Sequence, residues 1–459
     1  MSSTILHIKP EEIDTAEKRM KYAISIIGCG QIGVLHAYLF AEAGFRVICV
    51  DADQTRVNSI MRGKMPLLKR EIELKVKNHV KTGLLSAVTD LKSAVSKSDV
   101  IVITVPVEVD ARKKIKYSNL ENACKQVGTS LCRGTLVIII STVGVGVTKE
   151  LIKELLENTS GFKAGADFGL AYSPIRVLRG QPLETFVDQE RIIAAADRDS
   201  LNAASSILGN ITKNGVKQTE NVKAAEAVAL FNAVQQDVNM ALAGEFAIFC
   251  EKIGVDYFEA RKLVESGVYS ALSLPNLACD NIRVEPYLLS ENSEDLNLKL
   301  RVPSVAREVN DLMIKHAVNL TKEALLSCGK TLRRAKISLL GISQIPNIKS
   351  SPKKSVKELA KLLGAKGAKV GLYDPYFMDY ELSETQYSLR KNLGEALEGA
   401  DCILILTSHD QFKHLNLKKL KVVMKMPAAI VDFEDVVDPY EVEKEGFTYR
   451  GLGRGVWTK

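Results

Sequence analysis

Short apolar runs rich in β-branched residues alternate with stretches of helical pattern from Tyr22 to about residue 200. The runs are AISIIG, FRVICVD, VIVITV, TLVIIIS, FGLAYS and RIIAAA. Strands that alternate with helices are typical of a parallel sheet with helices on both faces. The first part of the chain is therefore predicted to be a doubly wound α/β domain.

The same rhythm begins again at Ala335. KISLLG is followed by a helical stretch over 353–367, by KVGLYDP, by a second helical stretch near 391–399, and then by DCILILTS and AAIVDF. This pattern predicts a second Rossmann-like half, although no sequence repeat between the halves is obvious. Two domains of this type suggest two nucleotide-containing ligands.

The segment between the halves is alanine-rich over 205–265. It has little glycine or proline between Lys223 and Lys252, which predicts a helix of roughly 30 residues and about 45 Å. A polar loop region over 270–302 precedes another helical stretch over 304–326. We expect an α/β protein with two Rossmann-like doubly wound domains, joined by a central helical domain with a long helix. The expected boundaries are 1–21 for an N-terminal extension, then 22–205, 206–330 and 331–459.

Length and composition narrow the class of protein. A chain of 459 residues with 46% hydrophobic content can form two or three domains, each with its own core. The formal charge of +7 is spread over scattered lysines and arginines, so we expect no nucleic-acid partner. Apolar runs such as Leu136–Ile140 are too short to cross a bilayer, and the start of the chain lacks a signal-peptide apolar region, so no membrane partner is expected. The eight cysteines lack CxxC pairs and metal-ligand spacing, which favours a reducing cytoplasm without disulfides or a bound metal.

The segment AISIIGCGQIG holds the clearest candidate binding motif. A strand, a glycine turn and a helix follow one another here, so backbone amides and the helix dipole can bind a pyrophosphate. The next strand ends at Asp51, where a carboxylate reads ribose hydroxyls and repels a 2′-phosphate, which favours NAD over NADP. The alternative is a tight turn followed by a strand-end aspartate without a ligand. The residues expected at the cofactor are Gly28, Gly30, Gln31, Ile32, Gly33 and Asp51.

Two further strand ends are predicted to point at the same cofactor. Pro106 follows the VIVITV strand, and Thr142 follows TLVIIIS. Ligands of open parallel sheets bind beyond the carboxyl ends of the strands, so both residues are expected beside the nicotinamide half. In the alternative interpretation, a residue such as Ser141 only caps the next helix.

Eight segments occur in an order that resembles the UDP-glucose/GDP-mannose dehydrogenase family, from about residue 22 to 455. They are GCGQIG, STVGVGVT (141–148), YSPIRVLRG (172–180), GEFAIFCEKIGVD (244–256), VEPYLL (284–289), AREVND (306–311), LYDP (372–375) and GLGRG (451–455). The resemblance implies an NAD domain, a central helical dimerisation region that forms a homodimer, and a C-terminal nucleotide-sugar domain. It implies oxidation of the sugar C6 hydroxyl to a carboxylate in two NAD-dependent steps, through a cysteine thiohemiacetal and a thioester. It also places Asp51 and Arg56 at the adenosine ribose and Thr142 beside the cofactor.

The catalytic cysteine of the family has no direct counterpart in this chain. In an ungapped alignment from Val284, the family's cysteine position is occupied by Asn281, and Cys279 lies two residues earlier. The glycines that let the backbone approach the sugar are also absent there. Cys279 is then either a displaced nucleophile or an ordinary half-buried thiol.

Other family positions also differ. The helical lysine and asparagine correspond to Ala229 and Ala233, while Glu245 keeps its expected place. Lys223, Glu226 and Asn232 lie nearby but out of register, and charged residues early in a helix usually form a solvated face.

The family's Ser-Pro-Glu ends here in Ile175, which removes the expected general base. In the C-terminal half, Ile345 replaces the family's lysine, and a following Asp-x-Arg is deleted. For His409, a hydrogen-bonded role at a strand end is favoured over an acid or base role. Arg454 belongs to what remains of the family's fold signature.

Three hypotheses remain from the sequence. The first is a divergent NAD-dependent nucleotide-sugar 6-dehydrogenase, acting on a UDP-glucose, GDP-mannose or UDP-N-acetylhexosamine type of substrate. The second is a non-catalytic, NAD-binding dimeric homologue with a regulatory or assembly role, because four catalytic side chains are replaced together. The third is a two-electron sugar-nucleotide dehydrogenase, because that reaction needs no thiol.

Overall fold

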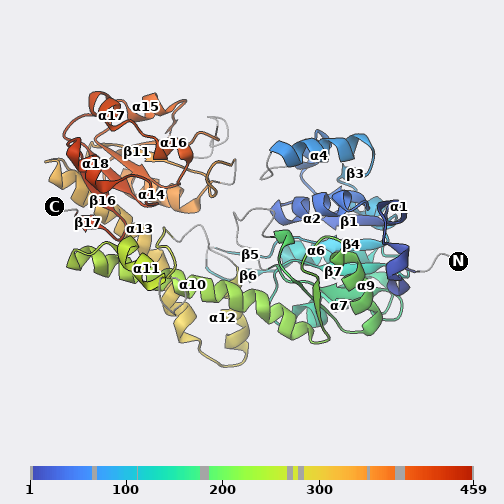
Figure 1. Ribbon diagram of the computed structural model, residues 1–459. Helices are drawn as coiled ribbons and strands as arrows, with labels where there is room; N and C mark the ends of the chain where they lie inside the picture. The colour runs from blue at the N-terminus through green and yellow to red at the C-terminus, as the bar shows by residue number, and fades with distance from the viewer. Residues whose placement is uncertain are drawn as a thin grey trace. The chain divides into compact units, whose positions relative to one another are not determined.

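The protein is described by a computed structural model over residues 4–64, 70–110, 112–175, 186–265, 272–277, 284–348, 352–377 and 388–456 (Figure 1). The chain forms two compact units. The first contains Met1–Val234 and Arg283–Lys299, and the second contains Gln235–Ile282 and Leu300–Lys459. Within the described ranges, no helix combines the length and apolarity needed to cross a membrane.

The first unit is built around a sheet of eight described strands in the order β10-β9-β8-β7-β4-β1-β2-β3. The strands are β1 (Ala23–Ile27), β2 (Arg46–Val50), β3 (Leu85–Val88), β4 (Val100–Ile103), β7 (Leu136–Ile139), β8 (Gly169–Tyr172), β9 (Arg191–Ala195) and β10 (Val216–Thr219). All neighbours run parallel except β8 and β9. The RIIAAA run thus forms a strand of reversed direction near one edge, as is common in large, mostly parallel sheets.

Helices cover both faces of this sheet. They are α1 (Ala16–Arg19), α2 (Gln31–Glu42), α3 (Gln54–Met61), α4 (Arg70–Lys81), α5 (Leu91–Val95), α6 (Ser118–Gly128), α7 (Lys153–Ser160), α9 (Arg198–Gly209) and α12 (Glu285–Asp295). Along β4, Val102 packs into the core under α2 and α9, while Ile101 and Ile103 pack into the core under α6 and α7. This alternation explains why the strand reads as a continuous apolar run. A two-stranded ribbon, β5 (Glu108–Val109) and β6 (Ile115–Lys116), follows β4.

The predicted N-terminal extension packs onto the first unit. Two short 3-10 helices, Ile5–His7 and Pro10–Glu12, precede α1. Ile5, Leu6 and Ile13 are buried in the core that also contains α2 and α9. The sequence predicted an extension over 1–21 without predicting this packing.

The second unit contains a sheet of seven described strands in the order β13-β12-β11-β14-β15-β16-β17. They are β11 (Lys336–Leu340), β12 (Lys369–Tyr373), β13 (Ser388–Leu389), β14 (Cys402–Ile405), β15 (Ala429–Asp432), β16 (Thr448–Gly451) and β17 (Gly455–Val456). Only the β16–β17 pair is antiparallel within this sheet. Its helices are α11 (Tyr257–Glu265), α13 (Arg301–Ser327), α14 (Lys354–Ala365), α15 (Leu393–Leu397), α16 (Asp410–Lys413), α17 (Leu417–Val423) and α18 (Pro439–Lys444).

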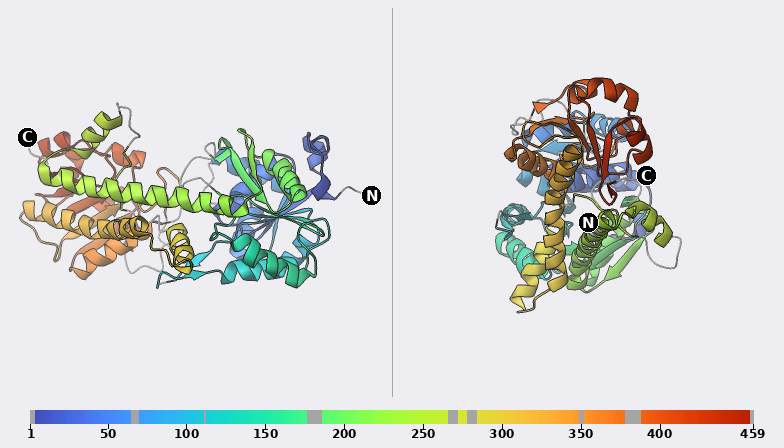
Figure 2. Two further views of the ribbon diagram at one scale, coloured as in Figure 1. Left: turned by 90° about the horizontal axis from the view of Figure 1, so that it is seen from below. Right: turned by 90° about the vertical axis from the view of Figure 1, so that its left-hand side faces the viewer.

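A long helix, α10 (Val222–Ile253), belongs partly to each unit (Figure 2). In the second unit, Asp237 on α10 accepts a hydrogen bond from Arg307 Nη1 on α13 at 2.8 Å and from Asn310 Nδ2 at 3.0 Å. All three residues are buried, so a buried ion pair joins α10 and α13. The predicted α/β architecture, with two doubly wound sheets and a helical middle, is confirmed. The region 206–330, which was predicted to be one central domain, is divided between the two units. The predicted domain boundaries stay a prediction.

Candidate functional site

The glycine turn after β1 requires glycine at two of its positions. Gly28 has a φ of +93°, which side chains other than glycine rarely adopt. A Cβ on Gly33 would lie 1.9 Å from the carbonyl oxygen of Gly28. Thr104, which follows β4, donates its hydroxyl to the same carbonyl at 2.6 Å. Thr104 therefore ties the turn to the end of β4, and the turn leaves no room for a side chain at Gly33.

At Gly30 no atom of the described residues packs against the turn. Gly30 is the N-cap of α2, no side chain caps the helix there, and a Cβ on it would meet no atom within 4 Å. Gln31 and Ile32 form the first turn of α2 and are partly exposed. An uncapped helix N-terminus beside an open glycine fits a pyrophosphate, because amide donors and the positive end of the helix dipole face the ligand.

Asp51 follows β2 and holds the turn from the other side. Its Oδ2 accepts hydrogen bonds from Cys29 N at 2.7 Å and Arg56 Nη1 at 2.8 Å, and its Oδ1 accepts one from Asp53 N at 3.0 Å. Partial burial acts to lower the pKa of Arg56, but the hydrogen bond and ion pair with Asp51 outweigh it and raise that pKa. Because Oδ1 has a single donor, it keeps a lone pair for a ribose hydroxyl. The sequence-predicted group of Gly28, Gly30, Gly33, Asp51 and Arg56 thus lies together and fits a dinucleotide.

Pro106 and Thr142 lie where the sequence expects them, beyond the carboxyl ends of β4 and β7. Pro106 is exposed, and Thr142 is half-buried. Ser141 does not cap a helix: its hydroxyl donates to the carbonyl of Ile103 at 3.3 Å. The loop that contains Thr142 is therefore anchored to β4 at its first residue.

The rest of this loop is held by three side chains from distant parts of the first unit. Gly144 N donates to Tyr117 Oη at 3.1 Å, and Val145 N donates to Asn292 Oδ1 at 2.8 Å. Glu226 on α10 completes the set, which we call the loop clamp: Tyr117, Asn292 and Glu226. With these acceptors in place, successive amides after Thr142 are paired with protein groups instead of a ligand.

Glu226 is the deepest member of the loop clamp. Its side chain is buried, and its two carboxylate oxygens accept hydrogen bonds from Gly146 N at 2.6 Å and Thr148 N at 2.8 Å. Burial raises the pKa of Glu226, although hydrogen bonds from Thr148 and Gly146 act in the opposite direction. The expectation of a solvated face is correct for Lys223, which is exposed and pairs with Glu150. It is wrong for Glu226, because the amides of this loop offer a carboxylate partners that the sequence does not show.

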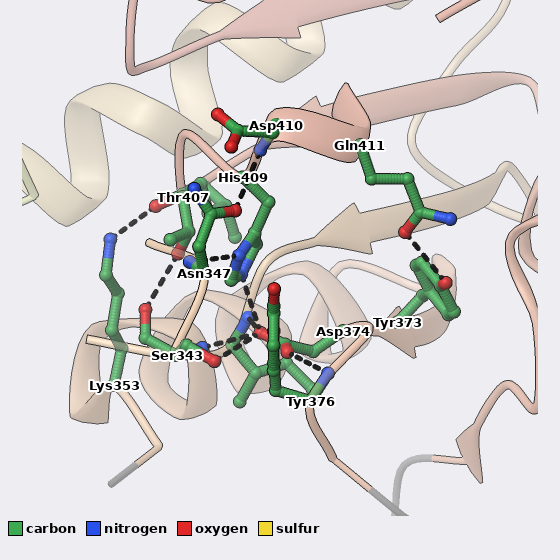
Figure 3. A network of polar contacts seen from close by, with 12 residues as sticks. Ser343, Asn347, Lys353, Tyr373, Asp374, Tyr376, Thr407, His409, Asp410 and Gln411 are labelled. Atoms are coloured by element: carbon green, nitrogen blue, oxygen red, sulfur yellow. Dashed lines mark hydrogen bonds and ion pairs between the residues drawn. The ribbon is translucent and has the colours of Figure 1, made fainter. Parts of the chain in front are cut away.

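In the second sheet, Asp374 takes the position that Asp51 takes in the first (Figure 3). It follows β12, and its Oδ2 accepts hydrogen bonds from Ile342 N, Ser343 N and Ser343 Oγ at 2.7 to 2.8 Å. Its Oδ1 accepts one from Tyr376 N at 2.8 Å. The turn after β11 is therefore held by a carboxylate with several internal donors.

His409 adds a further donor to Asp374. Its Nδ1 accepts a hydrogen bond from Asn347 N at 2.9 Å, so the ring proton of a neutral His409 lies on Nε2, which donates to Asp374 Oδ2 at 3.2 Å. Tyr376 stacks on the imidazole ring with centroids 5.3 Å apart. Burial acts to raise the pKa of Asp374, but hydrogen bonds from His409 and Ser343 outweigh it and leave that pKa lowered. His409 thus has the hydrogen-bonded role at a strand end that the sequence favoured over acid–base chemistry.

Arg454 also has a structural position in the second unit. Its Nε donates to Asp256 at 2.8 Å, its Nη1 pairs with Asp435 at 2.8 Å, and its guanidinium lies 4.8 Å from the ring centroid of Phe258. Burial acts to lower the pKa of Arg454, but Tyr449 and the two carboxylates outweigh it and raise that pKa. Arg454 therefore ties the start of α11 to the end of the second sheet.

Comparisons with known proteins agree with this geometry. The NAD binding domain of the UDP-glucose/GDP-mannose dehydrogenase family matches residues 22–212, and the UDP binding domain of the same family matches residues 338–439. A UDP-N-acetyl-D-mannosamine dehydrogenase of Pyrococcus horikoshii is 31% identical over 435 residues, which cover 94% of this chain and 99% of the relative. The chain belongs to the UDP-glucose/GDP-mannose dehydrogenase family. Its first unit therefore carries the family's NAD-binding domain, and its cofactor is NAD.

Further members of the family show the same relationship. A UDP-N-acetyl-D-mannosamine dehydrogenase of Methanocaldococcus jannaschii is 30% identical over 94% of this chain and 96% of the relative. The solved structure of the UDP-D-ManNAc dehydrogenase from Pyrococcus horikoshii has a TM-score of 0.84 at 28% identity, with 94% of this chain and 99% of that chain covered. An NDP-N-acetyl-D-galactosaminuronic acid dehydrogenase from Methanosarcina mazei has a TM-score of 0.77 at 26% identity, with 96% and 98% covered.

Only some of the positions that the family resemblance predicts to be catalytic lie within the described residues. Cys279 and Asn281 lie outside the described residues. Ala229 and Ala233 on α10 are buried, with exposed fractions of 4% and 3%, whereas Glu245 on the same helix is exposed. At the two alanine positions the chain therefore offers no side chain that could polarise a substrate.

The loop clamp is the part of the site that sequence reasoning missed. Asn292 and Val145 are 147 positions apart, and Glu226 and Gly146 are 80 apart, so no local period connects them. The only available signal was an isolated acid in the apolar first turns of α10, and it was interpreted as solvated. Tyr117 and Asn292 carried no signal at all.

Proposed function

We propose that this family member is an NAD-dependent 6-dehydrogenase of a UDP-linked N-acetylhexosamine of the UDP-N-acetyl-D-mannosamine type. The observation that carries the proposal is the complete cofactor cradle, Gly28 to Gly33 with Asp51, in a chain similar over almost its whole length to proteins named for that activity.

The reaction oxidises the sugar C6 alcohol to a carboxylate. Overall, the alcohol and one water lose two hydrides and three protons. NAD, when bound, accepts hydride at its nicotinamide ring. The chain's own contribution is positional: the amides at Gly30 and Gln31 would bind the pyrophosphate, and Asp51 and Arg56 would orient the ribose. The loop clamp holds the loop that follows Thr142.

The second oxidation needs a nucleophile, and Cys279 is our candidate for it. A thiol adds to the aldehyde to give a thiohemiacetal, which can then lose hydride. Asn281 at the family's cysteine position cannot form this adduct. Glu245 remains a candidate for a supporting role at the substrate.

A panel assay tests the proposal. Purified protein is mixed with NAD and with UDP-N-acetyl-D-mannosamine, UDP-N-acetylglucosamine, UDP-glucose or GDP-mannose, and NADH absorbance is followed. We expect the first sugar to give the highest rate and twice as much NADH as sugar consumed. Equal amounts of NADH and sugar would show the two-electron reaction instead. The absence of NADH with every sugar would refute an active dehydrogenase.

A second function is favoured by the buried alanines of α10. Ala229 and Ala233 leave the helix without the lysine and asparagine that the family resemblance implies, so the chain could bind NAD and a nucleotide sugar without turnover. In that case calorimetry would detect NAD binding while the panel assay stays negative. A homologue of this kind acts through its bound ligands, in regulation or assembly.

We also propose a homodimer through α10, within a cytoplasmic protein. Leu242, Phe246, Phe249 and Ile253 are each at least 40% exposed, and they recur at intervals of four, three and four residues along the helix. This spacing places them in one stripe, and an exposed apolar stripe is typical of an interface. Light scattering should give twice the monomer mass for the wild type and a lower mass for Phe249→Asp. A monomeric wild type would refute the dimer.

A further inference from the structure

Lys353 lies at the point of the second sheet where ligands of doubly wound folds bind. The strand order β12-β11-β14-β15 reverses its direction of growth between β11 and β14, and ligands bind beyond the carboxyl ends of strands at such a point. Lys353 N donates to the carbonyl of Ile342, which follows β11, at 2.8 Å, and Lys353 Nζ donates to the carbonyl of Leu406, which follows β14. This one residue therefore connects the two strand ends that flank the reversal.

The other polar groups around this point are occupied by one another (Figure 3). Asp374 Oδ2 accepts hydrogen bonds from Ser343 and His409, and its side chain has no exposed surface. Thr407 Oγ1 donates to the carbonyl of Ser343 at 2.8 Å. These groups brace the turn, so a ligand that binds here has to be held by a different side chain.

Among the residues that the structure describes, Lys353 keeps a donor for such a ligand. Its ammonium has three N–H groups and two observed acceptors, the Leu406 carbonyl and Glu434 Oε1 at 3.2 Å. The Lys353 side chain is 15% exposed and that of Glu434 is 28% exposed, so the pair is partly removed from water but still reachable. A compact ammonium in this setting is suited to a phosphate oxygen.

We propose that Lys353 binds the diphosphate of the nucleotide sugar in the UDP-binding domain, and that Glu434 competes with the diphosphate for the same ammonium. This inference rests on the proposed function, because it takes a UDP-linked substrate as given. The two residues have opposite effects on binding: Lys353 attracts the anion, and Glu434 neutralises part of that attraction. A purely structural ion pair would not show this opposition.

Calorimetry on the whole protein with UDP and with uridine tests the proposal. We expect Lys353→Met to weaken UDP binding by about tenfold or more, because a charged hydrogen bond is lost, and to leave uridine binding unchanged. Glu434→Gln should tighten UDP binding roughly two- to fivefold. Lys361→Met is the matched control: it removes the same charge from an exposed position on α14, the helix whose N-cap is Lys353, and should leave the binding of both ligands unaffected.

Other calorimetry results would overturn either the role of Lys353 or the proposed function. Unchanged UDP binding in Lys353→Met, or an equal loss of UDP and uridine, overturns the role of Lys353 while the proposed function stands. A wild type that binds NAD but no UDP overturns the proposed function, and the inference with it. If Lys353→Met fails to fold, Glu434→Gln decides alone, and weaker or unchanged UDP binding in that variant overturns the proposal.

Discussion

The turns after β1 and β11 are built from the same parts but differ in what they leave open. Gly28 and Gly341 have φ values of +93° and +96°, and each donates its amide at 2.8 Å to the last residue of the neighbouring strand, Val50 or Tyr373. A threonine from the next strand, Thr104 or Thr407, donates to a carbonyl of each turn. The backbone scaffold is thus shared, in a chain whose two halves show no obvious sequence repeat.

The aspartates beside these turns show the difference. Asp51 accepts three hydrogen bonds, one of them from the partly exposed Arg56, and lies beside the open Gly30. Asp374 accepts five, one of them from the buried His409. The carboxylate that we propose to bind the cofactor ribose in the first sheet therefore corresponds to an internal brace in the second. A strand-end aspartate alone does not indicate a nucleotide ribose.

The largest effect is expected when a side chain is introduced into the turn after β1. Gly33→Ala places a Cβ 1.9 Å from the Gly28 carbonyl oxygen, so the turn has to move, and NAD binding should weaken about a hundredfold. Calorimetry with NAD measures the effect. Gly209→Ala in α9 is the control, because its Cβ would meet no atom within 4 Å. Undiminished NAD binding in Gly33→Ala would contradict the role of the turn.

A second test compares the two aspartates directly. Asp374→Asn should lower the free energy of unfolding by about 2 to 4 kcal/mol at neutral pH, because an amide cannot accept from so many donors. Asp51→Asn should lower the free energy of unfolding by less than Asp374→Asn does. It should weaken NAD binding roughly tenfold and reduce the preference for NAD over NADP. Chemical denaturation and calorimetry measure these effects. Similar stability losses without a change in NAD binding would show that both aspartates are only braces.

The pH dependence of Asp374 follows from its lowered pKa. A carboxyl whose pKa is lower in the folded state stabilises the protein above its ordinary pKa, and this contribution is lost as the pH falls below about 4. The difference in unfolding free energy between the wild type and Asp374→Asn should therefore shrink in that range. A difference that stays constant with pH would contradict the assignment.

The smallest expected effect concerns the loop clamp. Asn292→Ala removes one acceptor and leaves Val145 N unpaired, while Tyr117 and Glu226 still hold the neighbouring amides. The KM for NAD should rise about threefold with little change in kcat, as for the loss of one neutral hydrogen bond. Glu294→Ala, at an exposed position on α12, is the matched control. A fall in kcat with an unchanged KM would place Asn292 at the chemistry instead of at the cofactor loop.

The sequence predicted what depends on local pattern. AISIIG became β1, KISLLG became β11, and the long helix expected between Lys223 and Lys252 is Val222–Ile253. Gly28, Gly33 and Asp51 were found because their spacing is fixed by a single strand–turn–helix–strand unit. The reversal of β9 and the loop clamp were missed, because both depend on contacts between segments far apart in the chain. The hydrogen-bonded role of His409 was predicted only as a preference, since its partners, Asn347 and Asp374, come from two different loops.

The position of Glu226 matters for attempts to introduce new side chains on α10. Ala229 and Ala233 follow it by three and seven residues, so all three lie on one buried face of α10. The hydrogen bonds from Gly146 N and Thr148 N to Glu226 tie this face of α10 to the loop. Ala229→Lys with Ala233→Asn would therefore place two new polar side chains on a face of α10 that is already held against this loop.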